Sequence, residues 1–167
     1  REKFIADFEY LRTFRHPNIE LFLGLVVDAR PLFLMTEWLE AGSLADKLNA
    51  HRVTKTQLPE SLQLSYLISV ARALLYLHSR SIIHYNVKPS NVLLGSGGEA
   101  KLGDLAAAKV LAANALRRSC GAFRVGNLMY TAPELKEATN LTNKVDIFSL
   151  GGNRHIEFHT LVLVSCY

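Results

Sequence analysis

At 167 residues, with 49% hydrophobic and 20% charged side chains, the chain is long and apolar enough for one globular domain, which excludes a disordered or collagen-like protein. The 19 Lys and Arg exceed the 15 Asp and Glu by only four, too small an excess for a nucleic-acid-binding stripe. No apolar run approaches the roughly 18 residues of a membrane span, no secretory signal opens the chain, and two cysteines without ligand spacing favour a reducing, cytoplasmic location.

The first part of the chain predicts a helix, a hairpin and a second helix. Apolar spacing over residues 4–14 is typical of an amphipathic helix, which ends before a His-Pro pair. Two apolar runs, 21–27 and 32–35, are separated by turn residues and therefore predict a β-hairpin. A short helix is expected after Gly42, with Ser43 as its cap and Asp46 in its first turn.

The longest predicted helix runs from Pro59 to about His78 and is expected to be the central buried helix. The residues that keep its 3.6-residue period, and so its expected buried face, are Leu64, Leu67, Ile68, Ala71, Leu74, Leu75 and His78. Short strands are expected next, around residues 82–83, 92–94 and 100–102, with a glycine-rich turn between the last two. Residues 105–130 show no regular pattern, and so long an irregular segment is usually functional or mobile.

Residues 82–94, which read I-I-H-Y-N-V-K-P-S-N-V-L-L, carry the most informative pattern. This segment resembles the catalytic loop of the protein kinase family, H-R-D-L-x-x-x-N, and His84 and Asn91 fall on the family positions. Residues 101–106, K-L-G-D-L-A, resemble the strand and metal-binding D-F-G segment, and residues 130–134 contain an intact A-P-E.

Three further segments follow the same family order. Residues 146–151, D-I-F-S-L-G, resemble the start of the large helix beneath the catalytic loop. Residues 16–19, H-P-N-I, resemble the segment after the regulatory helix, and residues 36–44 resemble the gatekeeper, the hinge and the following helix. Six segments in the family order over residues 1–151 make coincidence very improbable. The residues of the hinge and H-P-N-I segments are most similar to those of the tyrosine-kinase-like Ser/Thr group.

The resemblance implies an α+β, protein-kinase-like fold that is incomplete. Residues 1–36 would be a small-lobe remnant with the regulatory helix (αC in the family) and two strands. Residues 37–151 would be the hinge and the mainly helical large lobe, up to the start of the helix beneath the catalytic loop (αF in the family). Residues 152–167 are a divergent tail, so we expect a truncated or degenerate copy of the family domain.

The resemblance also assigns roles for phosphoryl transfer from ATP with Mg²⁺. Asn86 stands at the position of the catalytic base and Lys88 near the γ-phosphate, while Asn91 and Asp104 stand at the metal positions. The remaining implied sites are the nucleotide-binding residues Glu37, Leu39 and Leu93 and the structural or regulatory residues Asp7, Thr36, His84, Tyr85, Glu134 and Asp146.

Three substitutions depart from the family pattern. The amide of Asn86 cannot take a proton as an aspartate does, and lost base catalysis costs about 10² to 10⁴ in rate. Tyr85 replaces the arginine that pairs with an activation-loop phosphate. Asp7, at the position of the regulatory-helix glutamate, is one methylene shorter, and the chain begins after the glycine-rich loop and strand lysine that grip ATP.

These departures predict a catalytically impaired pseudokinase that acts by binding another protein, with no nucleic acid and no membrane span. A weakly active Ser/Thr kinase in a longer native chain is the first alternative. A non-functional fragment is the second. Each alternative keeps the same kinase ancestry, and Asn86 is expected to decide between the pseudokinase and the weakly active kinase if the native chain completes the kinase domain.

Overall fold

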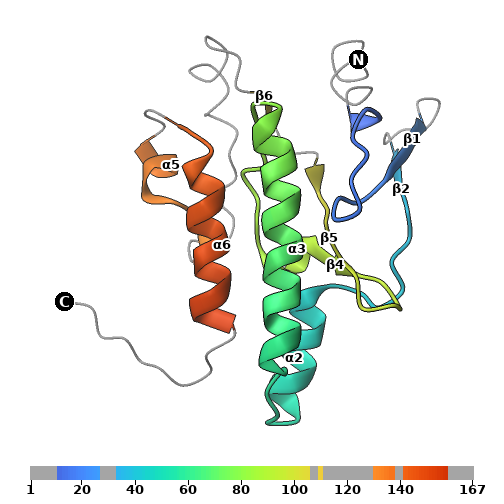
Figure 1. Ribbon diagram of the computed structural model, residues 1–167, viewed down its shortest axis with the longest axis vertical. Coiled ribbons are helices and arrows are strands. Elements are labelled where there is room, and N and C mark those ends of the chain that lie inside the picture. Colours follow the sequence, from blue (N-terminus) through green and yellow to red (C-terminus); the bar gives the residue numbers. More distant parts are fainter. Residues whose placement is uncertain (1–10, 27–32, 106–108, 111–129, 138–140, 158–167) are drawn as a thin grey trace.

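The computed structural model describes residues 11–26, 33–105, 109–110, 130–137 and 141–157. Its elements are β1 (Phe22–Val26), β2 (Phe33–Thr36), α2 (Leu44–Val53), α3 (Glu60–Ser79), β3 (Ile82–Ile83), the 3₁₀ helix η1 (Pro89–Asn91), β4 (Val92–Leu94), β5 (Ala100–Leu102), β6 (Lys109–Val110), α5 (Pro133–Glu137) and α6 (Lys144–Glu157) (Figure 1). Helices and small antiparallel strand pairs make up these elements, and the expected α+β class is confirmed.

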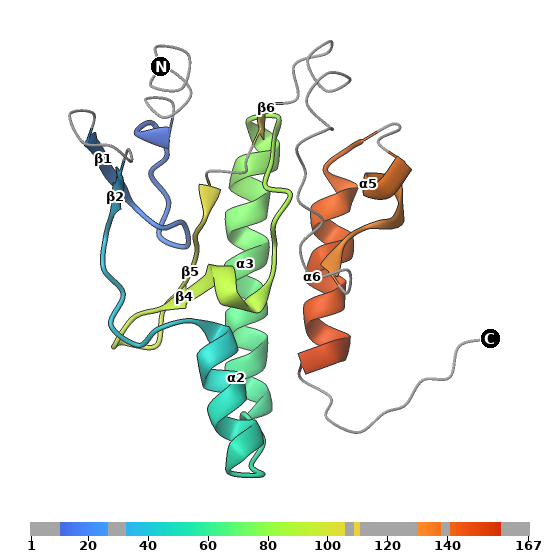
Figure 2. The same cartoon turned by 180° about the vertical axis from the view of Figure 1, so that it is seen from behind.

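Helix α3 is the axis around which the other elements are arranged (Figure 1). The β4–β5 pair packs against α3, and α6 packs against it on another side (Figure 2). Helix α2 lies beside the lower part of α3 and contacts β4 and η1. The loop between β3 and β4 is therefore held between the long helix and α6.

The predicted hairpin is present as β1 and β2, which pair antiparallel with an irregularity between Phe22 and Gly24. The segment before it is joined to the large lobe through β5. Asn18 accepts from the backbone N–H of Leu102 at 2.8 Å, and Glu20 donates to the Leu102 carbonyl at 3.0 Å. These two bonds fix the hairpin relative to the strand that leads to the predicted metal position.

Helix α2 begins at the predicted cap. The Ser43 hydroxyl accepts from the Asp46 backbone N–H at 3.2 Å, and the Asp46 carboxylate accepts from the Ser43 N–H at 2.9 Å. This reciprocal pair is a capping box, which satisfies two backbone donors at the helix start. The hydrogen bonds to Ser43 lower the pKa of Asp46.

Helix α3 begins after Pro59 as predicted, but its expected buried face is wrong. The buried residues are Tyr66, Val70, Ala73, Leu74 and Leu77. Of the residues expected inside, Leu64 is 57% exposed, Ile68 42% and Leu75 70%, and only Leu74 is buried. Apolar residues lie on both sides of this helix, so the period alone did not identify which side faces the core.

The main core gathers residues from the N-terminal segment, α3 and the β4–β5 pair. The predicted helix over residues 4–14 lies outside the described residues except at its end, where Leu11 and Phe14 are buried in this core. Within the segment expected to be irregular, the described residues include the short strand β6, which pairs antiparallel with β3. No described helix combines the length and the apolar character needed to cross a membrane.

Candidate functional site

The β4–β5 pair brings the predicted metal residues together. Val92 faces Leu102 in the register, and the Gly103 N–H donates to the Asn91 carbonyl at 2.8 Å just beyond the pair. Asn91 ends η1 and Asp104 follows Gly103, so the pairing places their side chains side by side. A two-strand register thus positions groups that are thirteen residues apart.

The side chains of Asn86, Asn91 and Asp104 form one hydrogen-bonded cluster. Asn86 Nδ2 donates to Asp104 Oδ2 at 2.6 Å, and Asn91 Nδ2 donates to the same oxygen at 3.2 Å. Asn91 Nδ2 also contacts the Asn86 carbonyl oxygen at 2.8 Å. Because a carboxylate can only accept, the atom of Asn86 that faces Asp104 is its amide nitrogen. The residue at the base position therefore acts as a hydrogen-bond donor to the predicted metal carboxylate.

The backbone around this cluster is held in uncommon conformations. Asp104 has φ +57° and Tyr85 has φ +66°, both in the left-handed region that side chains rarely adopt. A Cβ at Gly103 would lie 2.7 Å from Glu20 Oε2 and 3.0 Å from Leu93 Cδ1, so the close approach favours glycine there. Such strained positions persist only where surrounding contacts fix them.

The arrangement does not fit a magnesium ion as it stands. Magnesium takes octahedral oxygen ligands, usually one or two carboxylates with phosphates and waters. Asp104 and Asn91 are suitable residue types, but Oδ2 of Asp104 already accepts two amide N–H groups. A cation at this oxygen would be repelled by the two amide N–H groups, so the Asn86 side chain would have to rotate away from Asp104 before a cation could bind. Elsewhere in the described ranges, no group of three or more His, Cys, Asp or Glu side chains could hold a metal.

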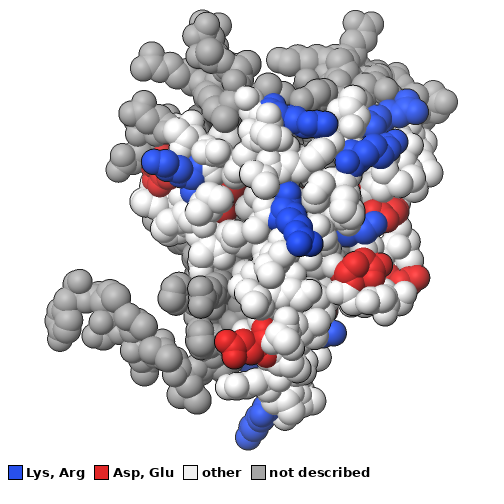
Figure 3. Space-filling model, in the orientation of Figure 1, with Lys and Arg blue, Asp and Glu red and all other residues white. Residues whose placement is uncertain are grey.

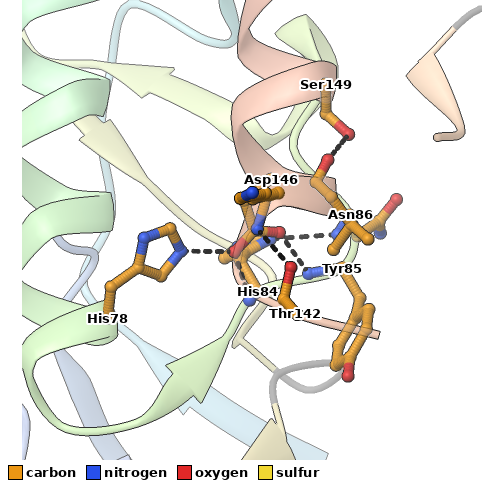
Figure 4. Close-up of polar contacts among 9 residues, drawn as sticks. His78, His84, Tyr85, Asn86, Thr142, Asp146 and Ser149 are labelled. Atoms are coloured by element: carbon orange, nitrogen blue, oxygen red, sulfur yellow. Dashed lines mark hydrogen bonds and ion pairs between the residues drawn. The ribbon is translucent and has the colours of Figure 1, made fainter. Parts of the chain in front are cut away.

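Asp146 of α6 fixes the start of the catalytic loop (Figure 4). Its Oδ2 accepts from the His84 backbone N–H at 2.9 Å, and its Oδ1 accepts from the Tyr85 N–H at 2.8 Å. His78 Nε2, from α3, lies 2.8 Å from Oδ2 on the other side. Asp146 is fully buried, and these contacts satisfy its carboxylate. Asp146 thus contacts the backbone of residues 84 and 85 and the ring of His78, a residue that the sequence analysis did not assign to the site.

The His84 ring is fully buried and has a partner at each nitrogen. The Asn86 backbone N–H donates to Nδ1 at 3.2 Å, so Nδ1 carries no proton, and Nε2 donates to the Gly103 carbonyl at 2.9 Å. This pattern requires the neutral ring. Burial lowers the pKa of His84 below its ordinary value of 6.5, although the Asp146 carboxylate and the Gly103 carbonyl act in the opposite direction.

The neutral His84 ring makes stability depend on pH. The pKa of His84 is lower in the folded chain than in the unfolded chain, so below about pH 6.5 unfolding is accompanied by uptake of a proton at this ring. The stability that the neutral buried ring contributes is therefore lost as the pH falls below that value. We expect the free energy of unfolding, measured in urea, to fall between pH 7 and pH 5. Ring resonances should show His84 neutral in the folded chain at pH 6. A ring protonated at that pH while the chain stays folded would contradict this assignment.

Two of the predicted nucleotide-binding residues, Glu37 and Leu39, lie in the segment after β2, and the third, Leu93, lies in β4. The Glu37 backbone N–H donates to the Leu21 carbonyl at 2.9 Å, and its side chain accepts from the Leu21 N–H and from Lys101 Nζ, each at 2.6 Å. Thr36 is half-buried, whereas Leu39 is buried. The same segment reaches Leu93, because Ser43 forms a bridge with it. The structure therefore connects the predicted hinge to both β1 and the β4–β5 pair.

The remaining predicted positions are spread more widely. Lys88 is half-buried at the start of η1, and Glu134 is half-buried in the first turn of α5. Asp7 lies outside the described residues. Two residues of the site were missed: His78 was interpreted only as part of an apolar face, and Lys101 only as part of a strand. A charged or titratable side chain inside an apolar pattern was the available signal for both.

Comparison with known proteins agrees with this geometry. The protein kinase domain family model matches residues 1–154. The chain therefore belongs to the protein kinase family, whose active members use ATP and Mg²⁺ to phosphorylate proteins.

Three curated relatives illustrate the range of the family. The chain is 33% identical over 150 residues to the mitogen-activated protein kinase kinase kinase MST11 of Pyricularia oryzae, covering 87% of this chain and 16% of that protein. It is 33% identical over 152 residues to the serine/threonine-protein kinase max-2 of Caenorhabditis elegans, covering 90% and 22%. It is 32% identical over 148 residues to the inactive leucine-rich repeat receptor-like protein kinase CORYNE of Arabidopsis thaliana, covering 87% and 35%. The chain thus spans about a third or less of each relative's length.

Proposed function

We propose that this chain is a pseudokinase domain that acts by binding another protein. The observation that carries the proposal is the 2.6 Å hydrogen bond from Asn86 Nδ2 to Asp104 Oδ2. This bond joins the residue at the base position to the residue at the predicted metal position. Asn86 therefore binds Asp104 where an active kinase would bind a substrate hydroxyl, and Asp104 binds Asn86 where an active kinase would bind a cation.

Asn86 removes general-base catalysis for a chemical reason. A base must accept a proton from the attacking hydroxyl, and an amide has no basic group for it. The amide oxygen could still orient a hydroxyl, but the amide nitrogen is already directed at Asp104. The same side chain therefore disfavours both proton transfer and binding of a cation at Asp104.

The remaining contacts of the site support a loop that keeps its structure and has lost its catalytic activity. The Asp146 contacts and the buried neutral His84 hold the loop backbone in place without any reacting group. A rigid loop is a suitable scaffold for a binding surface. The names of two relatives, CORYNE and a Dictyostelium discoideum protein that is 32% identical, describe them as inactive or probably inactive kinases. The resemblance to the tyrosine-kinase-like group is a finer part of the same proposal.

A weakly active Ser/Thr kinase is the second candidate, and a specific observation favours it. Lys88, Asn91 and Asp104 are all present, and Asn91 and Asp104 lie within hydrogen-bonding distance of one another. These are the residues that would neutralise and position phosphates. Phosphate transfer separates this candidate from the pseudokinase.

The test is radiolabelled phosphate transfer by the longest natural protein that contains this chain, alone and with a generic protein substrate. We expect the unmodified protein to transfer no more phosphate than its Asp104→Ala variant. The Asn86→Asp variant should exceed both, by up to about 10² to 10⁴, because it restores a base and releases Asp104. It should also broaden more strongly with Mn²⁺ in NMR spectra, which reports on the metal position without turnover.

Two outcomes would contradict the pseudokinase. Metal-dependent transfer by the unmodified protein, abolished in Asp104→Ala, would establish the active kinase. A 167-residue chain without a cooperative melting transition would favour the non-functional fragment.

A further inference from the structure

Four residues with cationic or titratable side chains lie near the Tyr76 ring of α3, and one of them, Arg15, donates from its guanidinium to the Phe14 carbonyl at 2.9 Å. The Arg80 guanidinium lies over the Tyr76 ring, 4.2 Å from its centroid. The His16 ring is 5.0 Å from the same ring, and the Tyr76 hydroxyl accepts from the Arg15 backbone N–H at 3.1 Å. Arg72 lies one turn before Tyr76 on the helix. We call Arg15, His16, Arg72, Tyr76 and Arg80 the basic patch.

The arginines of the basic patch have no carboxylate partner within the described part of the chain. In that part of the chain, ion pairs join His78 with Asp146 and Lys101 with Glu37, and both pairs lie outside the patch. Figure 3 shows blue side chains over the middle and upper part of α3 and to its right, with red side chains lower down and at the sides. Burial lowers the pKa of His16, and the Arg72 charge lowers it further, so the two side chains are close enough to repel each other when both are charged.

The patch has a definite length and direction. Arg72 and Tyr76 lie four residues apart on α3, and Arg80, four residues further, is the C-cap of that helix, so Arg72 and Arg80 are separated by roughly 12 Å along the helix axis. An extended peptide covers this distance in about four residues. Two carboxylates at that spacing could each meet a guanidinium while the backbone between them crosses Tyr76. Arginine suits this contact because its planar group pairs with carboxylates.

We propose that the basic patch docks an extended acidic peptide segment of the protein partner. The proposal rests on the protein-binding part of the proposed function and names the chemistry of the partner. Docking would supply the negative charge that the patch lacks and would leave the Asn86 and Asp104 cluster untouched. Its strength should fall as salt is added, because exposed ion pairs are screened.

The test measures fluorescence anisotropy of a labelled decapeptide of alternating Glu and Ala, with the Gln and Ala decapeptide as the neutral probe. We expect the acidic probe to bind the unmodified protein and the neutral probe to bind much more weakly. The Arg72→Gln, Arg80→Gln double variant should raise the acidic probe's Kd by about three- to ten-fold, the range expected for two exposed ion pairs. The Arg52→Gln, Lys55→Gln variant removes the same charge from exposed positions at the end of α2 and should leave Kd nearly unchanged.

Several results would overturn the docking proposal. They are no binding of the acidic probe, equal binding of the neutral probe, and equal weakening by the two double variants. Tighter binding of a single-stranded RNA oligonucleotide, lost in the Arg72 and Arg80 variant, would assign the patch to nucleic acid instead. If the acidic peptide does not bind and no phosphate is transferred, the docking proposal is wrong and the pseudokinase proposal is unaffected. If the unmodified protein transfers phosphate, the pseudokinase proposal is wrong whether or not the peptide binds.

Discussion

The Asp146→Ala variant is expected to lose about 3 to 5 kcal/mol of unfolding free energy, the range for removing one partner of a buried charged contact. Asp146 accepts from the backbone N–H groups of His84 and Tyr85 and lies beside His78 Nε2. Alanine would leave those donors buried and unsatisfied, and each such group costs about 1 to 3 kcal/mol. The loss would fall mainly on the loop that carries Asn86.

Urea unfolding followed by circular dichroism measures this loss. Glu60→Ala removes an exposed carboxylate from the first turn of α3 and should cost less than about 1 kcal/mol. If Asp146→Ala does not fold, Asp146→Asn keeps the shape and one acceptor and should still be clearly less stable. A change in Asp146→Asn no larger than that in Glu60→Ala would contradict the role assigned to Asp146.

The second large effect is expected for an alanine substitution in the buried face of α3, compared with a matched substitution in its exposed face. Leu77 is fully buried in the main core, and Leu77→Ala should lower the unfolding free energy by about 2 to 5 kcal/mol, because a cavity remains. Leu75 is 70% exposed, and Leu75→Ala should change the unfolding free energy by less than about 1 kcal/mol. The two variants remove the same atoms from the same helix, two residues apart.

Thermal and urea unfolding of the pair decide which side of α3 faces the core. Equal losses would mean that both sides are covered in solution. A larger loss for Leu75→Ala would support the face that the sequence pattern favoured and contradict the face observed in the structure.

The elements were predictable where the signal is local. The capping box at Ser43 and Asp46 and the start of α3 after Pro59 both follow from residues next to one another in the chain. The buried face of α3 was not predictable, because Leu64 and Leu75 on one side are as apolar as Val70 and Leu77 on the other. The packing of β3, β5 and α6 against α3 distinguishes the two sides. The strand at residues 82–83 was predicted, but its pairing with β6 was missed because the two residues of β6, Lys109 and Val110, leave no pattern in the sequence.

The sequence predicts the positions of the candidate site but not the contacts between its residues. The family resemblance identified Asn86 and Asp104 from the spacing of their motifs. That Asn86 donates to Asp104 depends on the β4–β5 register and on the left-handed backbone of Asp104, which motif spacing does not encode. The basic patch was missed for the same reason, because Arg15 and Arg80 meet at Tyr76 only in the folded chain.

The Asp146 contacts also constrain the order in which the domain forms. They join α6 to His84, 62 residues earlier, and to His78, 68 residues earlier. Closing so long a segment is slow and entropically costly compared with forming α3 or the capping box of α2. The catalytic loop should therefore reach its final backbone conformation only after α6 docks. Protection of the His84 and Tyr85 amides from hydrogen exchange would then report α6 docking, and it would appear late in refolding.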